Sequence, residues 1–256
     1  MRKHLLKRSA FFVLPCIAAA LLSVPATLQA DPIEAHDGLS AAQHMVAITE
    51  GGVLYDSWYG ALGKEAPKET HPAYPKAGKQ KGATTWRCKE CHGWDYKGAS
   101  GAYGKGGRYT GIRGIRNLTH ASESAVVSIL KDKTHGFSQL IPQKDLEALA
   151  HFVSHGQVDV DVYIERATKK VKGEPARGER IFQTTCAWCH GSDGKQINFK
   201  TPADPEYIGT VANENPWETL HKIRMGQPGV PMISMLAFDV QNHADILAYA
   251  QSLPRK

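Results

Sequence analysis

The chain has 256 residues, of which 42% are hydrophobic and 22% are charged, and it contains no low-complexity run. This composition is that of an ordinary globular protein and excludes a fibrous or disordered chain. The length allows roughly one or two domains of ordinary size, each able to bury its own core. The formal net charge of the whole chain is +6.

The first thirty residues have the pattern of a secretory signal peptide. Basic residues at positions 2, 3, 7 and 8 precede an apolar stretch over 10–24, and Ala26 and Ala30 offer cleavage points. This stretch is shorter than the roughly 20 residues of a membrane-spanning helix, so we expect cleavage and a periplasmic protein. Cleavage would lower the net charge to +2, because the segment holds four basic and no acidic residues. Nucleic-acid binding is therefore not expected, nor is a transmembrane segment in the mature chain, since no later apolar run approaches that length.

Residues 41–62 are predicted to form the first helix of the mature chain, and a stretch rich in Pro, Gly and Lys follows over 64–82. That composition indicates an irregular inserted loop. Aromatic residues and a histidine, including His71, Tyr74 and Trp86, punctuate this region. We interpret the insertion as an exposed linker, with packing over a cofactor edge as the alternative.

Four cysteines remain once Cys16 is removed with the signal peptide, and all of them lie in two copies of the pattern C-x-x-C-H. The residues of the two copies are Cys88, Cys91 and His92 in the first, and Cys186, Cys189 and His190 in the second. This pattern is the attachment motif of c-type haem, in which both thiols bond the vinyl groups and the histidine becomes the proximal iron ligand. Cysteines three apart on one helical turn face the same side, which is the geometry that attachment needs.

The alternative interpretations are a redox C-x-x-C, a zinc knuckle built from both pairs, or a disulfide in each motif. A histidine follows each pair directly, and both copies continue into glycine, at Gly93 and Gly191. Export would also bring the chain to the compartment where c-type haem is attached. The two motifs therefore predict two covalent haem c groups.

The two motifs begin 98 residues apart, and a shift of 97 residues superposes two predicted helices at the ends of the halves. These helices are expected over 143–154 and 240–253, each with apolar residues at helical spacing. Each half is therefore predicted to end in an amphipathic helix.

A short helix over 176–182 precedes the second motif, with Pro175 placed to start it. Residues 174–254 resemble a class I cytochrome c domain, in which the N-terminal helix crosses the C-terminal helix near a glycine and an aromatic residue. The resemblance assigns these positions to Gly178, Phe182 and Tyr249.

The first half departs from this compact pattern through its insertion, and its counterpart of the N-terminal helix is the helix over 41–62. We therefore expect an all-α chain of two tandem cytochrome c-like domains, each wrapped around a covalent haem. The expected boundaries are 1–30 for the signal peptide, 31–165 for the first domain and 166–256 for the second.

The resemblance implies a methionine as the distal ligand of the second haem, from a Pro/Gly-rich loop over 226–235. Met225 ends a predicted helix and fits a core contact, whereas Met235 lies close to the last helix. Met232 lies 42 residues after His190 and matches the loop position of the family. Met232 is the expected ligand, and Met235 is the alternative.

The first half has no methionine between Met45 and Met225, so a methionine from its own loop cannot be its distal ligand. Applying the shift of 97 residues to Met232 gives His135, which lies 43 residues after His92. An imidazole is therefore predicted in place of the thioether, giving a bis-histidine haem.

Four other histidines of the first half are alternative ligands: His71, His120, His151 and His155. His151 lies beside Phe152 on the terminal helix and is expected at the surface. His120 falls before the helix that should carry the ligand loop, and His71 lies in the insertion.

Methionine ligation raises the reduction potential of a haem relative to bis-histidine ligation. We therefore expect a soluble electron carrier between redox protein partners, with electrons moving from the first haem to the second and no bond chemistry. The alternatives are a dihaem enzyme with an open iron position and a haem subunit of a larger oxidoreductase. A cysteine as distal ligand is excluded, because all four mature thiols are used for attachment.

Overall fold

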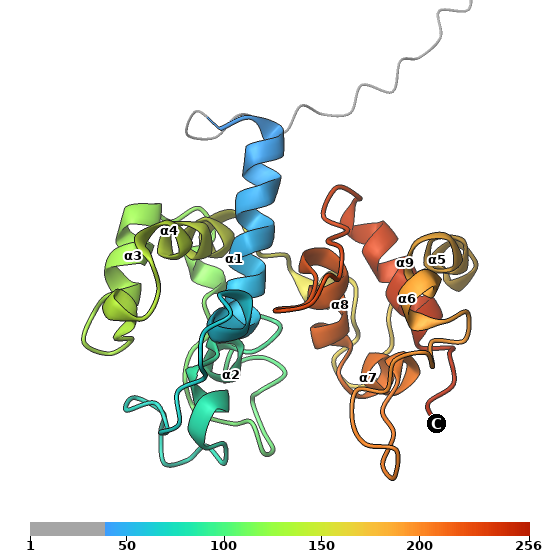
Figure 1. Ribbon diagram of the computed structural model, residues 1–256, viewed down its shortest axis with the longest axis horizontal. Helices are drawn as coiled ribbons and strands as arrows, with labels where there is room; N and C mark the ends of the chain where they lie inside the picture. The colour runs from blue at the N-terminus through green and yellow to red at the C-terminus, as the bar shows by residue number, and fades with distance from the viewer. Residues whose placement is uncertain (1–38) are drawn as a thin grey trace, which may run out of the picture. The chain divides into compact units, whose positions relative to one another are not determined.

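The computed structural model describes residues 39–256, and the predicted signal peptide lies outside these residues. Within them the chain is helical, with isolated bridges in place of β-strands, which agrees with the predicted all-α class. The α-helices are α1 (Ala41–Ala61), α2 (Cys88–His92), α3 (Glu123–Leu130), α4 (Gln143–His151), α5 (Pro175–Ile181), α6 (Ala187–His190), α7 (Ile208–Glu214), α8 (Pro216–Met225) and α9 (Val240–Ala250) (Figure 1). Over 39–256, no helix combines the length and the apolar character that crossing a membrane requires.

Local capping sets where several of these helices begin. The Ser40 hydroxyl accepts a hydrogen bond from the backbone of Gln43, and the Gln43 side chain accepts one from the backbone of Ser40. This capping box satisfies two of the backbone N–H groups that a helix start leaves unpaired. Pro175 occupies the first turn of α5, where its missing N–H has no cost, and the Asp239 carboxylate caps α9. The predicted helix starts therefore agree with the structure to within one residue.

In the second half, α5 crosses α9 at Gly178 (Figure 1). A Cβ atom at this position would lie 2.9 Å from the backbone nitrogen of Ile246 and closer still to the carbonyl of Asp245. Only glycine allows the two backbones to come so close. Beside the crossing, the rings of Phe182 and Tyr249 pack with centroids 5.3 Å apart, as the resemblance implied.

The first half contains the same crossing between α1 and α4. A Cβ atom at Gly51 would lie 2.8 Å from the carbonyl carbon of Ala148, and the rings of Tyr55 and Phe152 have centroids 5.4 Å apart. The aromatic residue follows the glycine by four positions in both halves, and Phe152 precedes Tyr249 by the same 97 residues that relate the terminal helices. The crossing geometry is therefore repeated.

The two halves differ in the chain between the crossing glycine and the first motif cysteine. That segment spans 37 positions from Gly51 to Cys88 and only 8 from Gly178 to Cys186, a difference of 29. The insertion over 64–82 supplies 19 of these residues, and the longer α1 and the chain on either side of the insertion supply the rest. The added length explains why the N-terminal helices do not follow the shift that relates the terminal helices.

Buried charges join α1 to α8 and fix the packing between the halves. The Asp56 carboxylate is fully buried and accepts hydrogen bonds from Arg87 and from Lys222 Nζ, the latter at 2.6 Å. Burial by itself would raise the pKa of Asp56, but the positive charges of Lys222 and Arg87 outweigh burial and lower it. A buried carboxylate paired in this way stays ionised at neutral pH.

A buried histidine on α8 completes this interface. His221 Nε2 donates to the carbonyl of Gly52 at 2.9 Å, and the Tyr96 hydroxyl donates to His221 Nδ1 at 2.9 Å. Burial lowers the pKa of His221 to about 4, so the ring is neutral at pH 7 and can take this donor and acceptor arrangement. Met225, also buried, packs its side chain against Gly52, as its predicted core role requires.

Candidate functional site

The first motif forms a single helical turn, α2, that ends at Gly93. Gly93 has φ +79, a conformation that favours glycine and stops the helix directly after His92. Cys88 and Cys91 are free, half-buried thiols, which does not agree with a disulfide inside the motif. Burial raises the pKa of both thiols to about 12, whereas a redox C-x-x-C requires a lowered thiol pKa.

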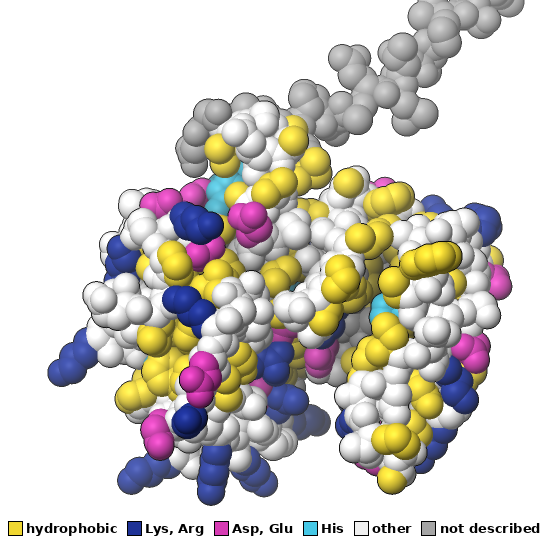
Figure 2. All heavy atoms as spheres, in the orientation of Figure 1, with side chains coloured by type: hydrophobic (Ala, Val, Ile, Leu, Met, Phe, Trp, Pro, Cys, Tyr) yellow, Lys and Arg dark blue, Asp and Glu magenta, His cyan; other side chains and the backbone are white. Residues whose placement is uncertain are grey.

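The two cysteines and His92 line a cavity of about 510 Å³ in the first half. Its walls are mainly apolar and include residues of α3, of α4 and of the turns around them. They include Ile115, Leu118, Val126, Leu130, Phe137, Leu149 and Val153. Figure 2 shows hydrophobic side chains gathered on the face of the first half that lies below α3 and α4 in Figure 1. The volume and the apolar lining are those of a cofactor site.

His92 and His135 face one another across this cavity. Their ring centroids lie 6.4 Å apart and their planes differ by only 22°. Two imidazoles that bind one metal ion from opposite sides, each at about 2 Å, would hold their centroids ~6 Å apart. The structure therefore brings together His92 of the first motif and His135, the histidine that the shift of 97 residues selected.

Each of these imidazoles is held through Nδ1. His92 Nδ1 donates to the carbonyl of Arg113 at 3.0 Å, and His135 Nδ1 donates to the Asp132 carboxylate at 3.1 Å. Among the described residues, no hydrogen bond reaches Nε2 of either ring. At metal sites, a hydrogen bond from the second ring nitrogen fixes the histidine tautomer and directs Nε2 towards the metal, and both rings have such a bond. Burial also lowers the pKa of His92 to about 4, which keeps the ring neutral and able to coordinate.

Sequence reasoning did not single out Arg113 or Asp132. The Arg113 carbonyl leaves no mark in the sequence, because any residue could supply it. Asp132 stands three positions before His135, and its carboxylate also accepts the backbone N–H of His135 at 2.8 Å. An acidic residue three positions before a candidate ligand was therefore an available signal.

The insertion folds against the cavity, so its interpretation as an exposed linker is wrong for the part around His71. The His71 ring packs on Trp86 with centroids 4.4 Å apart and lies 6.0 Å from Phe137. His71 Nε2 donates to the carbonyl of His135 at 3.2 Å, and His71 Nδ1 accepts from the backbone of Ala73 at 3.1 Å. Both ring nitrogens of His71 are used in these hydrogen bonds. His71 therefore supports the loop that carries His135 and does not replace His135 as the residue facing His92.

The other alternative histidines lie away from the cavity. His151, expected at the surface, is instead buried, because it lies against the start of α1, where its ring meets His44. His120 donates its backbone N–H to Ser154, and neither His120 nor His151 lines the cavity. Of the histidines considered, His135 is the one that the fold places opposite His92.

In the second half, the motif again ends in a glycine with positive φ, since Gly191 has φ +81 directly after His190. Cys186 is half-buried, Cys189 is exposed, and Trp188 between them is 91% exposed. This turn is therefore far more open than its counterpart. Within residues 39–256, His190 Nδ1 is buried and meets no hydrogen-bond partner.

The three methionines of the second half differ in their surroundings. Met225 is buried at the end of α8, which confirms that it is a core residue. Met235 is also buried, and its carbonyl accepts a hydrogen bond from His243 Nε2 at 2.7 Å. Met232 is half-buried in the loop before α9, where its carbonyl lies beside Gly226. The selection of Met232 over Met235 as a ligand stays a prediction.

Comparison with known proteins gave a match in the second half. Residues 175–254 match the family model described as Cytochrome c, a span that contains the α5 and α9 crossing and the second motif. The search of curated proteins gave no match. The family match supports a c-type cytochrome, with covalently bound haem and haem-based electron transfer, in this part of the chain.

Proposed function

We propose that this chain is an exported dihaem cytochrome c that carries electrons between redox protein partners in the periplasm. One haem would be attached to Cys88 and Cys91, the other to Cys186 and Cys189. The observation that carries the proposal is the pair His92 and His135, two anchored imidazoles facing one another across an apolar cavity lined by two thiols.

The axial ligands would be His92 and His135 in the first domain, over 31–165, and His190 and Met232 in the second, over 166–256. The repeated helix crossing supports the presence of two related domains, because both halves place a glycine and an aromatic pair at the same point. The family match supports the second domain directly.

Each haem would supply a one-electron iron couple, and the residues of the chain determine how that couple behaves. Two axial side chains leave no position for a substrate, which favours an electron carrier over an enzyme. The mainly apolar walls would reduce the contact of the first haem with water, and the hydrogen bonds at Nδ1 would keep both imidazole rings oriented when the electron is transferred. The unequal ligand pairs predict a lower potential for the first haem than for the second.

A redox titration of the purified protein, read by absorption spectroscopy, tests this proposal. We expect two one-electron steps, the lower belonging to the bis-histidine centre, and no binding of carbon monoxide to the reduced wild-type protein. His135→Ala should open the first iron to carbon monoxide. Met232→His should lower only the higher potential and abolish the near-infrared band of methionine ligation.

The matched control is His120→Ala, which removes a histidine of the same half that does not line the cavity. It should leave both irons six-coordinate. Carbon monoxide binding to the wild-type protein would instead favour a dihaem enzyme. If His120→Ala opened the first haem while His135→Ala did not, the assignment of the first distal ligand would be wrong.

A further inference from the structure

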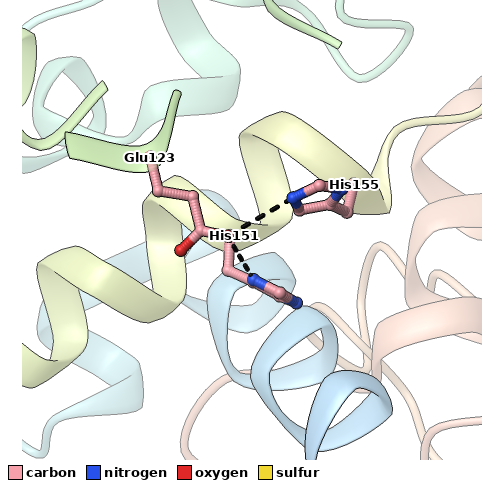
Figure 3. Close-up of side chains that lie close together, drawn as sticks. All are labelled: Glu123, His151 and His155. Carbon is pink, nitrogen blue, oxygen red and sulfur yellow. Dashed lines mark hydrogen bonds and ion pairs between the residues drawn. The ribbon is translucent and has the colours of Figure 1, made fainter. Parts of the chain in front are cut away.

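A second group of metal-binding side chains lies outside the haem cavity, at the start of α3 and the end of α4 (Figure 3). A single oxygen of Glu123, Oε1, lies 2.6 Å from His151 Nδ1 and 3.3 Å from His155 Nε2. The three atoms all lie within 4.8 Å of one another. None of the three residues lines the cavity that holds His92 and His135.

The backbone holds these side chains in place. His151 ends α4 and His155 lies in the π-helical turn Phe152–Gly156 that follows it, so the two rings project from one continuous stretch of helix. Glu123 comes from the first turn of α3. The site is partly enclosed, because the side chains of His151, His155 and Glu123 are 3%, 14% and 29% exposed.

His151 also has an outer partner, His44 on α1. His151 Nε2 and His44 Nδ1 lie 2.9 Å apart, and one nitrogen donates to the other. The imidazole of His151 is therefore fixed through Nε2 while its Nδ1 points to Glu123. A ligand ring held through its second nitrogen is the arrangement that orients histidines at metal sites.

The donor set suits a divalent cation. Two imidazole nitrogens and a carboxylate oxygen are ligand atoms of zinc, whose bonds of about 2.0–2.1 Å in tetrahedral geometry separate neighbouring ligand atoms by ~3.3 Å. Glu123 Oε1 and His155 Nε2 already lie at 3.3 Å, whereas Glu123 Oε1 and His151 Nδ1, at 2.6 Å, would have to move apart slightly to share an ion. Two histidines and one glutamate are a ligand set of known zinc sites that complete their coordination with water.

We propose that Glu123, His151 and His155 bind one divalent transition-metal ion of the zinc class, at a site separate from both haems. The ion would tie the start of α3 to the end of α4, next to the crossing of α4 with α1. Imidazole and carboxylate together also accept Cu²⁺ or Ni²⁺, so the identity of the metal depends on its supply.

The test uses the untagged, haem-loaded protein, stripped with a chelator and then equilibrated with zinc chloride at about 10 μM. After removal of free metal, elemental analysis should give one zinc per chain in addition to iron. His155→Gln and Glu123→Gln should weaken zinc binding at least about tenfold. The matched control, Glu147→Gln, changes an exposed carboxylate on α4 and should keep full binding.

Far-ultraviolet circular dichroism of each variant shows whether it has folded, so loss of zinc is not confused with loss of structure. X-ray absorption at the zinc edge provides a readout on the wild-type protein alone, and it should show two imidazoles and oxygen ligands without sulfur. The proposal is overturned if the wild-type protein retains no zinc, if His155→Gln retains it undiminished, or if sulfur appears among the ligands. Because these measurements count zinc and not haem, they stand apart from the proposed electron-transfer function.

Discussion

Gly178→Ala should destabilise the second half by forcing α5 away from α9. The added Cβ would lie 2.9 Å from the backbone nitrogen of Ile246 and closer to the carbonyl of Asp245, whereas an ordinary contact begins at 3.4 Å. These neighbours are backbone atoms of a helix, so the whole helix must shift by at least half an ångström. Overpacking of this kind costs about 1–3 kcal/mol or more, and the better helix propensity of alanine offsets up to about 1 kcal/mol.

The expected net loss is about 2 kcal/mol in the free energy of unfolding. For a chain of this size that corresponds to a fall of roughly 4–8 °C in the unfolding midpoint. Thermal unfolding of the haem-loaded protein, followed by far-ultraviolet circular dichroism, measures this shift. Gly51→Ala should give a fall of similar size, because its Cβ would lie 2.8 Å from the carbonyl carbon of Ala148.

Gly107→Ala provides the matched control for both variants. A Cβ at Gly107 meets no atom within 4 Å, and its φ is not positive, so the midpoint should stay close to that of the wild-type protein. A Gly178→Ala midpoint equal to that of Gly107→Ala would refute the crossing argument. A fall in Gly178→Ala without one in Gly51→Ala would refute the common architecture of the two halves.

The buried His221 should make the protein sensitive to acid: its pKa of about 4 lies below the unfolded value near 6.5, so the unfolded chain binds this proton first. The free energy of unfolding should therefore decrease as pH falls from about 6.5 towards 4, with a contribution of about 2 kcal/mol lost by pH 5, measurable by urea unfolding. Asp56→Asn leaves Arg87 and Lys222 without their shared carboxylate and should cost about 3 kcal/mol in the same assay. Replacing both thiols of either motif with alanine should lower the mass by one haem and leave the other haem attached.

Each of these outcomes has a specific control. His221→Gln should make the free energy of unfolding less dependent on pH between 7 and 5. An unchanged dependence would mean that groups other than His221 cause the decrease. Asp204→Asn changes an exposed carboxylate and should have little effect on unfolding, so an equal loss in both variants would contradict the buried ion pairs. Two haems remaining after Cys88→Ala with Cys91→Ala would contradict the attachment assignment.

The sequence by itself determined the features that depend on local spacing. Two thiols and a histidine within five residues fit one helical turn wherever that turn lies. Ser40 and Asp239 set helix starts through hydrogen bonds to residues three positions on, and Pro175 does so through its fixed φ angle. The position of His135 also followed from the sequence, because the segment between each motif and its terminal helix has nearly the same length in both halves. When equivalent elements are joined by segments of nearly equal length, corresponding residues of those segments can occupy corresponding positions in the fold.

Burial and side-chain partners were decided only by the tertiary structure, because they depend on which surfaces meet across long separations in sequence. The insertion is rich in Pro, Gly and Lys, yet His71 packs on Trp86 and Phe137 once the chain returns to the cavity. The sequence of its own helix predicts His151 at the surface, but the start of α1 covers it and supplies His44. The periodicity of one helix cannot reveal a neighbour that lies about a hundred residues away. The cluster of Glu123 with His151 and His155 likewise joins two different helices, so it became visible only in the folded chain.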